Sequence, residues 1–220
     1  MQLKLSEAIE RAEKAGACGD ELKVLQRLPD CNVLDLKHKQ ASFWAYWYAQ
    51  NVIQGRWSEA EPAIMANAKW AFSYAENVIK GRWPEAEPTI MADAKYAYWY
   101  ARDVIQGRWI EAEPIIMAKA QWAGWYAKDV IKDRWIEAEP TIMRSPHRAF
   151  SYAREIIKGR WIEAEPIIMR DAGLAYYYAR YVIKCRWPEA EPTIMTDTRS
   201  AYYYAKHVFP GPNREEATCN

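Results

Sequence analysis

Residues 94–119 read AKYAYWYARDVIQGRWIEAEPIIMAK, and this 26-residue unit recurs along most of the 220-residue chain. The tryptophan of its Arg-Trp pair recurs every 26 residues, without insertion or deletion, at Trp57, Trp83, Trp109, Trp135, Trp161 and Trp187. A fixed period of this length is typical of stacked repeats and not of one irregular core. Six full copies and one partial copy therefore predict a repeat array over residues 41–208.

The first half of each repeat has the apolar spacing of a helix. Residues at i, i+3, i+4, i+7 and i+8 lie on one face of a helix, and in the repeat 94–119 they are Ala97, Tyr100, Ala101, Val104 and Ile105. A glycine follows in four copies, as at Gly107, and we expect it to end the helix in the left-handed conformation. Asp133 and Cys185 stand there in two copies, and Cys185 is expected to be strained.

The second half of each repeat, Trp-x-Glu-Ala-Glu-Pro-x-Ile-Met, predicts a shorter helix. Pro84 and Pro188 stand at its expected first position, where a missing N–H costs nothing. The later proline, as at Pro88, lacks the donor that a helix interior needs. We therefore expect either a kink or one turn followed by a restart at the proline. Two helices in each copy predict an all-α solenoid, or superhelix, of two-helix repeats.

The apolar stripe of the second helix contains a carboxylate, Glu61 in the first copy. A buried carboxylate is costly unless it is paired and hydrogen-bonded, so we expect Arg–Glu pairs, assisted by tyrosine hydroxyls, to join neighbouring repeats. The arginines are Arg56, Arg82, Arg108, Arg134, Arg160 and Arg186. The glutamates are Glu61, Glu87, Glu113, Glu139, Glu165 and Glu191. The other glutamate of each repeat, such as Glu59, falls off the stripe and is expected to be solvated.

The two ends of the chain do not follow the repeat. Residues 1–40 predict two short helices, over 5–15 and 21–28, which we interpret as a helical N-terminal cap because the terminal units of a solenoid must cover an apolar face. A separate functional module is the alternative, although its core would be small. After residue 208 the sequence Phe209-Pro-Gly-Pro replaces the expected motif, and residues 209–220 predict a polar C-terminal tail.

Composition favours a folded, water-soluble protein. Apolar residues make up 50% of the chain, and the formal net charge is only +1, which argues against a general polyanion binder. No stretch predicts a membrane span or a signal peptide. The four cysteines lack zinc-site spacing and are interpreted as free thiols. These features predict a cytoplasmic protein that does not enter a membrane.

The positions that differ between copies form the candidate binding surface. The aromatic candidates are Trp44, Trp47, Trp99, Trp122, Trp125, Tyr177 and Tyr203. The basic candidates are Arg102, Lys128, Lys132, Arg154, Lys158, Arg180 and Lys184. An exposed aromatic groove would suit a protein partner, whereas the simpler interpretation is packing between repeats. The basic column is either a solvated face or an anion site.

The sequence gives little support to catalysis. Its three histidines are isolated, and it contains no phosphate loop, HExxH or GxSxG motif. The two carboxylates of each Glu-Ala-Glu point in different directions on a helix. We therefore predict no enzymatic activity, no metal site and no cofactor.

The unit Ala-Tyr-x-Tyr-Ala-x-x-Val-Ile-x-Gly-Arg-Trp-x-Glu-Ala-Glu-Pro-x-Ile-Met resembles uncharacterised repeats in proteins of tailed bacteriophages, prophages and some large DNA viruses. The resemblance covers roughly residues 42–208 and implies a viral protein in the host cytoplasm. It transfers no functional residue. The expected function is binding of a host or viral protein, as in an inhibitor of a host defence factor. The alternatives are nucleic-acid or nucleotide binding along a basic-aromatic face and a structural, self-assembling viral protein, so a homo-oligomer is also considered.

Overall fold

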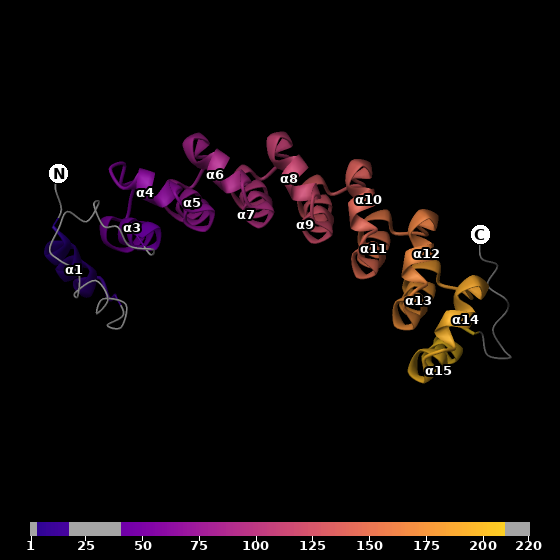
Figure 1. The fold of residues 1–220 in the computed structure, drawn as a ribbon. Coiled ribbons are helices and arrows are strands. Elements are labelled where there is room, and N and C mark those ends of the chain that lie inside the picture. Colours follow the sequence, from indigo (N-terminus) through magenta and orange to yellow (C-terminus); the bar gives the residue numbers. More distant parts are fainter. Residues whose placement is uncertain (1–3, 18–40, 210–220) are drawn as a thin grey trace. The chain divides into compact units, whose positions relative to one another are not determined.

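The computed structural model describes residues 4–17 and 41–209, and these residues form an all-α repeat fold (Figure 1). The chain divides into two compact parts, Met1–Ala112 and Glu113–Asn220, here called the N-terminal and C-terminal parts. None of the helices in the described ranges is long and apolar enough to cross a membrane.

In the N-terminal part, each complete repeat contains one long helix and one short helix. The long helix is α-helical and then widens into a π-helical turn. The short helix is preceded by a 3₁₀ turn in the second repeat but not in the first, where α4 stands alone. The elements are α1 Leu5–Lys14, α3 Ala41–Tyr48, η2 Ala49–Ile53, α4 Glu61–Met65, α5 Ala68–Tyr74, η3 Ala75–Ile79, η4 Pro84–Ala86, α6 Glu87–Met91, α7 Ala94–Trp99, η5 Tyr100–Ile105 and η6 Ile110–Ala112.

The C-terminal part repeats the same order of elements. It begins with the short helix α8 and ends with the long helix α15, which has no π-turn. The elements are α8 Glu113–Met117, α9 Ala120–Tyr126, η7 Ala127–Ile131, η8 Ile136–Ala138, α10 Glu139–Ile142, α11 Pro146–Tyr152, η9 Ala153–Ile157, η10 Ile162–Ala164, α12 Glu165–Ile168, α13 Ala172–Tyr178, η11 Ala179–Ile183, η12 Pro188–Ala190, α14 Glu191–Ile194 and α15 Thr198–His207.

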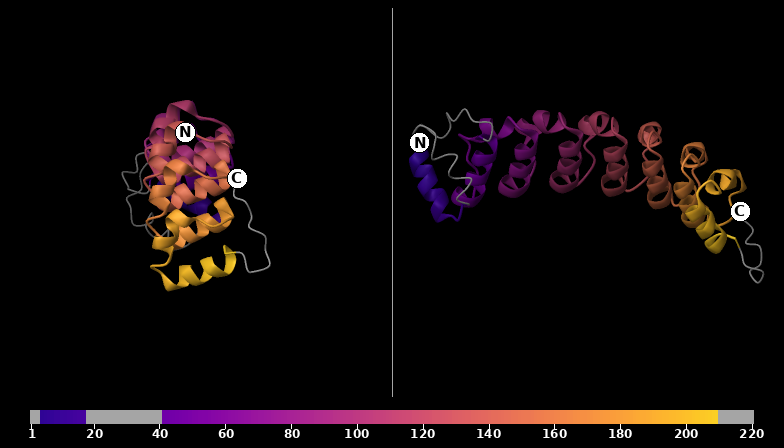
Figure 2. Two further views of the ribbon diagram at one scale, coloured as in Figure 1. Left: turned by 90° about the vertical axis from the view of Figure 1, so that its right-hand side faces the viewer. Right: turned by 60° about the horizontal axis from the view of Figure 1, so that its bottom comes forward.

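Within each part, the long helices of successive repeats lie side by side. Helix α5 contacts α3 and α7 in the N-terminal part, and α11 contacts α9 and α13 in the C-terminal part. The short helices follow along one edge of each part (Figures 1 and 2). Each of these two long helices also contacts the short helices before and after it in the sequence, α4 and α6 for α5, and α10 and α12 for α11.

The core between the helices consists of alanine, isoleucine and aromatic rings. Ala97, Tyr100 and Ala101 are fully buried, as their helical spacing predicts. The ring of Tyr100 packs against that of Trp109, with 5.0 Å between centroids. Alanine lets the helices approach closely, and a few large side chains fill the remaining space, such as Tyr74, Trp83 and Ile90 in the repeat before.

The left-handed residue at the end of each long helix is not the glycine. It is the residue before it, and the six positions with positive φ are Gln54, Lys80, Gln106, Lys132, Lys158 and Lys184. At the first of them, Gln54 has φ 55° and its backbone N–H donates to the carbonyl of Ala49. The prediction for glycine was therefore wrong, and Cys185 does not carry the strain expected of it, because that strain falls on Lys184, at φ 63°.

The prediction of a restart at the second proline is confirmed. Pro84 opens the 3₁₀ turn η4, and Pro88 lies in the first turn of α6, which begins at Glu87. The proline nitrogen thus falls where a helix has no donor to satisfy. The result is a 3₁₀ turn that passes directly into a new α-helical turn at Glu87.

Several helix starts have a side-chain cap that the sequence reading did not identify. The Asn67 side chain accepts the backbone N–H of Lys69, and Asp93 accepts that of Lys95. Asp197 caps α15 in the same way. Asparagine and aspartate are preferred at this position, so the signal was present in the sequence.

At the N-terminal end, α1 packs against the first long helix. Leu5 and Ala12 form a cluster with Trp44, and Ala8 packs against Tyr48. Helix α1 therefore covers the aromatic face of the first repeat, as a cap must. The predicted helix over 21–28 and most of the predicted tail lie outside the described residues.

Cys185 is disulfide-bonded, so the expectation of a free thiol is wrong for this residue. The other cysteines, Cys18, Cys31 and Cys219, lie outside the described ranges.

Candidate functional site: a repeated bridge and a variable face

Within each of the two parts, the Arg–Glu pairs form inside one repeat and not between repeats, which corrects the sequence-based expectation. Arg134 Nε and Nη2 each donate to a different carboxylate oxygen of Glu139 over 2.9 Å. The same two-bond contact recurs for Arg56–Glu61, Arg82–Glu87, Arg160–Glu165 and Arg186–Glu191. Because only five residues separate the partners, the pair braces the loop that leads into the short helix.

A tyrosine from the following repeat makes the connection between repeats. Tyr152 Oη lies 3.3 Å from Glu139 Oε1 and 2.6 Å from the backbone nitrogen of Trp135, so it donates to the carboxylate and accepts from the N–H. The glutamate contact recurs at Tyr74, Tyr100, Tyr126, Tyr178 and Tyr204. Glu139, which is 7% exposed, thereby gains the partners that its burial requires.

The same burial changes the acidity of the bridging tyrosines. Loss of solvent raises the pKa of Tyr74, Tyr100, Tyr152 and Tyr204 to about 12, although the hydrogen bond from the tryptophan N–H offsets part of the rise. The neighbouring glutamate adds to it, because a second negative charge beside the carboxylate is unfavourable. These hydroxyls therefore remain protonated at any physiological pH and act as fixed donors.

One side of each long helix, distinct from the side that carries the buried Ala-Tyr-Ala stripe, is here called the variable face. It comprises the positions of Phe43, Trp44, Tyr46, Trp47, Gln50 and Asn51 and their equivalents 26 residues apart. Residues three, four and seven apart share one side of a helix, so these positions form one surface. The candidate aromatic residues and most candidate basic residues lie on it.

The basic column of the variable face is largely neutralised by its neighbours. Arg102 pairs with Asp103 over 2.7 Å. Lys128 and Arg154 share the carboxylate of Glu155. These contacts reduce the positive field that a phosphate backbone would need.

The remaining basic candidates have other roles or environments. Arg180 donates to the Tyr176 hydroxyl over 2.6 Å. Lys132, Lys158 and Lys184 are exposed, and they are three of the left-handed residues that end the long helices. Their positions are thus part of the scaffold, although their ammonium groups face solvent.

The aromatic candidates are neither a free groove nor a fully closed core. Trp44 is 9% exposed beneath α1. Trp47, Trp99, Trp122, Trp125 and Tyr203 are half-buried, and Tyr177 is exposed. Trp44 is therefore buried, whereas the other six rings are each accessible to solvent on at least one side.

Contacts between repeats on the variable face follow one rule. The ring at the position of Tyr46 contacts a ring at the position of Trp44 or Trp47 in the next repeat. The pairs are Tyr46–Trp70, Phe72–Tyr96, Phe72–Trp99, Phe150–Tyr177 and Tyr176–Tyr203.

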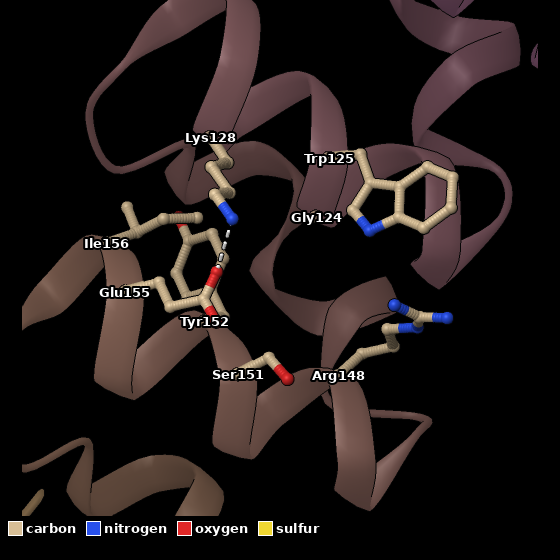
Figure 3. A pocket seen from close by; sticks show the side chains of 8 residues that line it. All are labelled: Gly124, Trp125, Lys128, Arg148, Ser151, Tyr152, Glu155 and Ile156. Atoms are coloured by element: carbon tan, nitrogen blue, oxygen red, sulfur yellow. Dashed lines mark ion pairs between the residues drawn. The ribbon is translucent and has the colours of Figure 1, made fainter.

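Between α9 and α11 this aromatic contact is replaced by a hollow. Gly124 stands at the position of Tyr46, while Arg148 and Ser151 stand where the next repeat usually places rings. A cavity of about 210 Å³ results, and it is also lined by Trp125, Lys128, Tyr152, Glu155 and Ile156. Figure 3 shows the Trp125 ring and the Arg148 guanidinium on one side of it and the Lys128–Glu155 ion pair on the other.

Two exposed tyrosines on the variable face were missed by the sequence reading. Tyr181 is 43% exposed and stacks on Tyr177, and Tyr202 is 58% exposed and lies edge-on to Tyr203. The runs Tyr176-Tyr-Tyr and Tyr202-Tyr-Tyr were the available signal. Together, Tyr177, Tyr181, Tyr202 and Tyr203 are here called the tyrosine patch.

No arrangement for metal chemistry is present in residues 4–17 and 41–209, where no three His, Cys, Asp or Glu side chains group as metal ligands would. Comparison with known proteins gives no further assignment. No protein family, curated protein or solved structure matches this chain.

Proposed function

We propose that this chain is a non-catalytic repeat protein that binds a protein partner through its variable face. In its finer form, the proposal is a phage-type inhibitor that captures a host defence factor in the host cytoplasm. The tyrosine patch carries the proposal, because exposed tyrosines combine large apolar area with a polar tip, and protein interfaces are enriched in them. The repeated Arg–Glu–Tyr bridge supports it by holding the variable side chains on a fixed scaffold.

Charge favours a protein over a nucleic acid as the partner. Proteins that bind phosphate backbones use unpaired cations, and their affinity falls steeply with salt. Here Arg102, Lys128 and Arg154 already have carboxylate partners. A partner that contacts the rings between these ion pairs gains buried apolar area without breaking the pairs.

Affinity purification from host lysate, with and without nuclease, tests the proposal. A protein should be retained after nuclease treatment, and its binding to the purified chain should change little between 50 and 300 mM salt. Retention that needs nucleic acid, or affinity that falls steeply with salt, would favour the nucleic-acid alternative. Elution as a discrete oligomer or a growing polymer, without a partner, would favour self-assembly.

Substitution of the tyrosine patch locates the interface. Replacing Tyr177 and Tyr202 with alanine should weaken partner binding at least tenfold and lower the melting temperature only slightly, because both side chains are exposed, although Tyr177 also contacts Phe150. Alanine at Ile136 and Ile162 is the matched control, since these side chains are 68% and 70% exposed on the short-helix side. If the isoleucine variant loses the partner and the tyrosine variant does not, the binding surface has been assigned to the wrong face.

The compartment is tested separately. A disulfide is uncommon in a reducing cytoplasm, yet Cys185 is bonded. Alkylation of cell lysate before reduction, followed by mass spectrometry of the Cys185 peptide, separates the two: a blocked thiol would support the proposed cytoplasmic location and contradict the disulfide. An oxidised peptide would point to an oxidising compartment.

A further inference from the structure

The hollow between α9 and α11 lies where a ring is missing from a regular column. The Tyr46 position carries an aromatic ring in six of seven copies and glycine only at Gly124. A Cβ atom built on Gly124 has no atom within 4 Å, so the helix leaves this space open. Arg148 and Ser151 have also replaced the rings that would close it from the next repeat. Three substitutions at one junction therefore remove one aromatic contact and leave its volume empty.

The size of the hollow fits a single ring better than a whole ligand. Its volume is about 210 Å³, whereas sites for drug-sized molecules measure roughly 300–1,000 Å³. A cavity of about 150 Å³ is sufficient to bind benzene. A phenyl or phenol group can enter here, but a nucleotide cannot be enclosed.

The residues that line the hollow determine which chemical group can bind in it. The Arg148 guanidinium lies 5.4 Å from the centroid of the Trp125 ring, so one wall is both aromatic and cationic. Arg148 has no ion-pair partner among residues 4–17 and 41–209. The single lining carboxylate, Glu155, is held by Lys128 over 2.7 Å and also by Arg154. The remaining positive charge at the rim therefore attracts an acidic group rather than a basic one.

We infer that this hollow is the anchor pocket for a tyrosine or phenylalanine side chain on an acidic segment of the partner protein. The ring occupies the place that the missing column residue would fill, against Trp125 and Ile156, and a neighbouring carboxylate pairs with Arg148. A tyrosine hydroxyl has the Ser151 side chain as a hydrogen-bonding partner. The inference rests on the proposed function and specifies the chemistry of the partner.

Defined peptides test the pocket directly. The probe is acetyl-Glu-Asp-Tyr-Glu-Asp-amide, and the readout is the Trp125 indole N–H signal of the ¹⁵N-labelled full chain, assigned with Trp125→Phe. The peptide should shift this signal in a saturable manner. Replacing its tyrosine with alanine, or its four acidic residues with lysine, should weaken binding at least tenfold. Equal binding of the alanine peptide, or tighter binding of AMP or UMP than of the tyrosine peptide, would overturn the inference.

A variant that fills the hollow provides a second, independent test of the inference. Gly124→Phe restores the ring of the column, and it should keep or raise the melting temperature because glycine is unfavourable inside a helix. It should reduce peptide binding at least tenfold, whereas Ile162→Phe, which adds an exposed ring elsewhere, should not. If Gly124→Phe folds and still binds the peptide equally well, the anchor is elsewhere. Loss of partner binding in the tyrosine-patch variant would still support the proposed function in that case, so the two failures can be distinguished.

Discussion

The Tyr152 hydroxyl accepts the backbone N–H of Trp135, 17 residues earlier in the chain, over 2.6 Å. The same hydroxyl donates to Glu139, and both contacts are buried. One oxygen atom therefore satisfies a peptide donor and a carboxylate of the preceding repeat. This bridge, and not the Arg–Glu pair, joins successive repeats.

Removing the hydroxyl oxygen of Tyr152 should destabilise the fold. Tyr152→Phe leaves the ring in place but deprives a buried N–H and a buried carboxylate oxygen of their partner, which should lower the free energy of unfolding by about 1–3 kcal/mol. Tyr181→Phe is the control, because Tyr181 is 43% exposed. Chemical denaturation measures both, and equal stability of the two variants would show that the bridge contributes nothing.

The two glutamates of one Glu-Ala-Glu motif should respond differently to neutralisation. Glu139→Gln keeps the shape but removes the charge that accepts two bonds from Arg134, and charge-assisted bonds are the stronger ones. We expect a loss of about 1–3 kcal/mol. Glu137 is exposed, and Glu137→Gln should change stability by less than about 0.5 kcal/mol. Thermal melting of the two variants checks this contrast.

Replacing a lysine by glycine at one of the left-handed positions should stabilise the fold. Lys158 has φ 57°, a conformation that costs a residue with a Cβ about 1–2 kcal/mol, although glycine loses more entropy on folding. Lys158→Gly should therefore raise stability by about 0.5–1 kcal/mol, and Lys158→Ala should not.

The next residue, Gly159, provides a second test of which residue has the left-handed conformation. Gly159 does not have positive φ, and the nearest atom to a Cβ there is 4.0 Å away. Gly159→Ala should consequently be nearly neutral in melting experiments. Strong destabilisation by that substitution would mean that the chain reversal lies at the glycine after all.

Stability should fall at alkaline pH in a defined window. Burial raises the pKa of Tyr74, Tyr100, Tyr152 and Tyr204 from 10 to about 12. Below pH 10 these groups are protonated in both states, and their contribution is fully present. Between pH 10 and 12 the unfolded chain releases protons that the folded chain retains, so stability decreases as pH rises. Absorbance at 295 nm should show late-ionising tyrosines that titrate normally in denaturant.

Much of the fold could be predicted from the sequence because its signals are local. The 26-residue period and the spacing of Ala97, Tyr100 and Ala101 predicted the helices and their buried side. The proline restart followed from the missing donor of Pro88. The π-turn could not be predicted, because the sequence Ala75–Ile79 differs little in apolar spacing from an α-helical turn. The left-handed residue was placed one position late for the same reason.

The site could be predicted only in part, because it depends on which side chains contact residues of their own repeat and which contact residues of a neighbouring repeat. Spacing indicated that Glu139 needed partners, but not that Arg134 would reach it within the repeat while Tyr152 reached it from the next. Position 124 is a glycine where the other copies have a ring, yet the empty volume also depends on Arg148 and Ser151 across the junction, so it was not predicted. Periodicity identifies the residues that share a face, and only coordinates show how neighbouring faces meet.

The tyrosine bridge also bears on how such a chain can evolve. Since the bridges within each part use the same atoms at the same separation, duplication or deletion of 26 codons leaves each remaining joint there with a matching partner. Unequal recombination within the gene could therefore lengthen or shorten the recognition surface by one whole repeat at a time. Point changes at positions such as 124 or 148 could then give each new copy its own specificity.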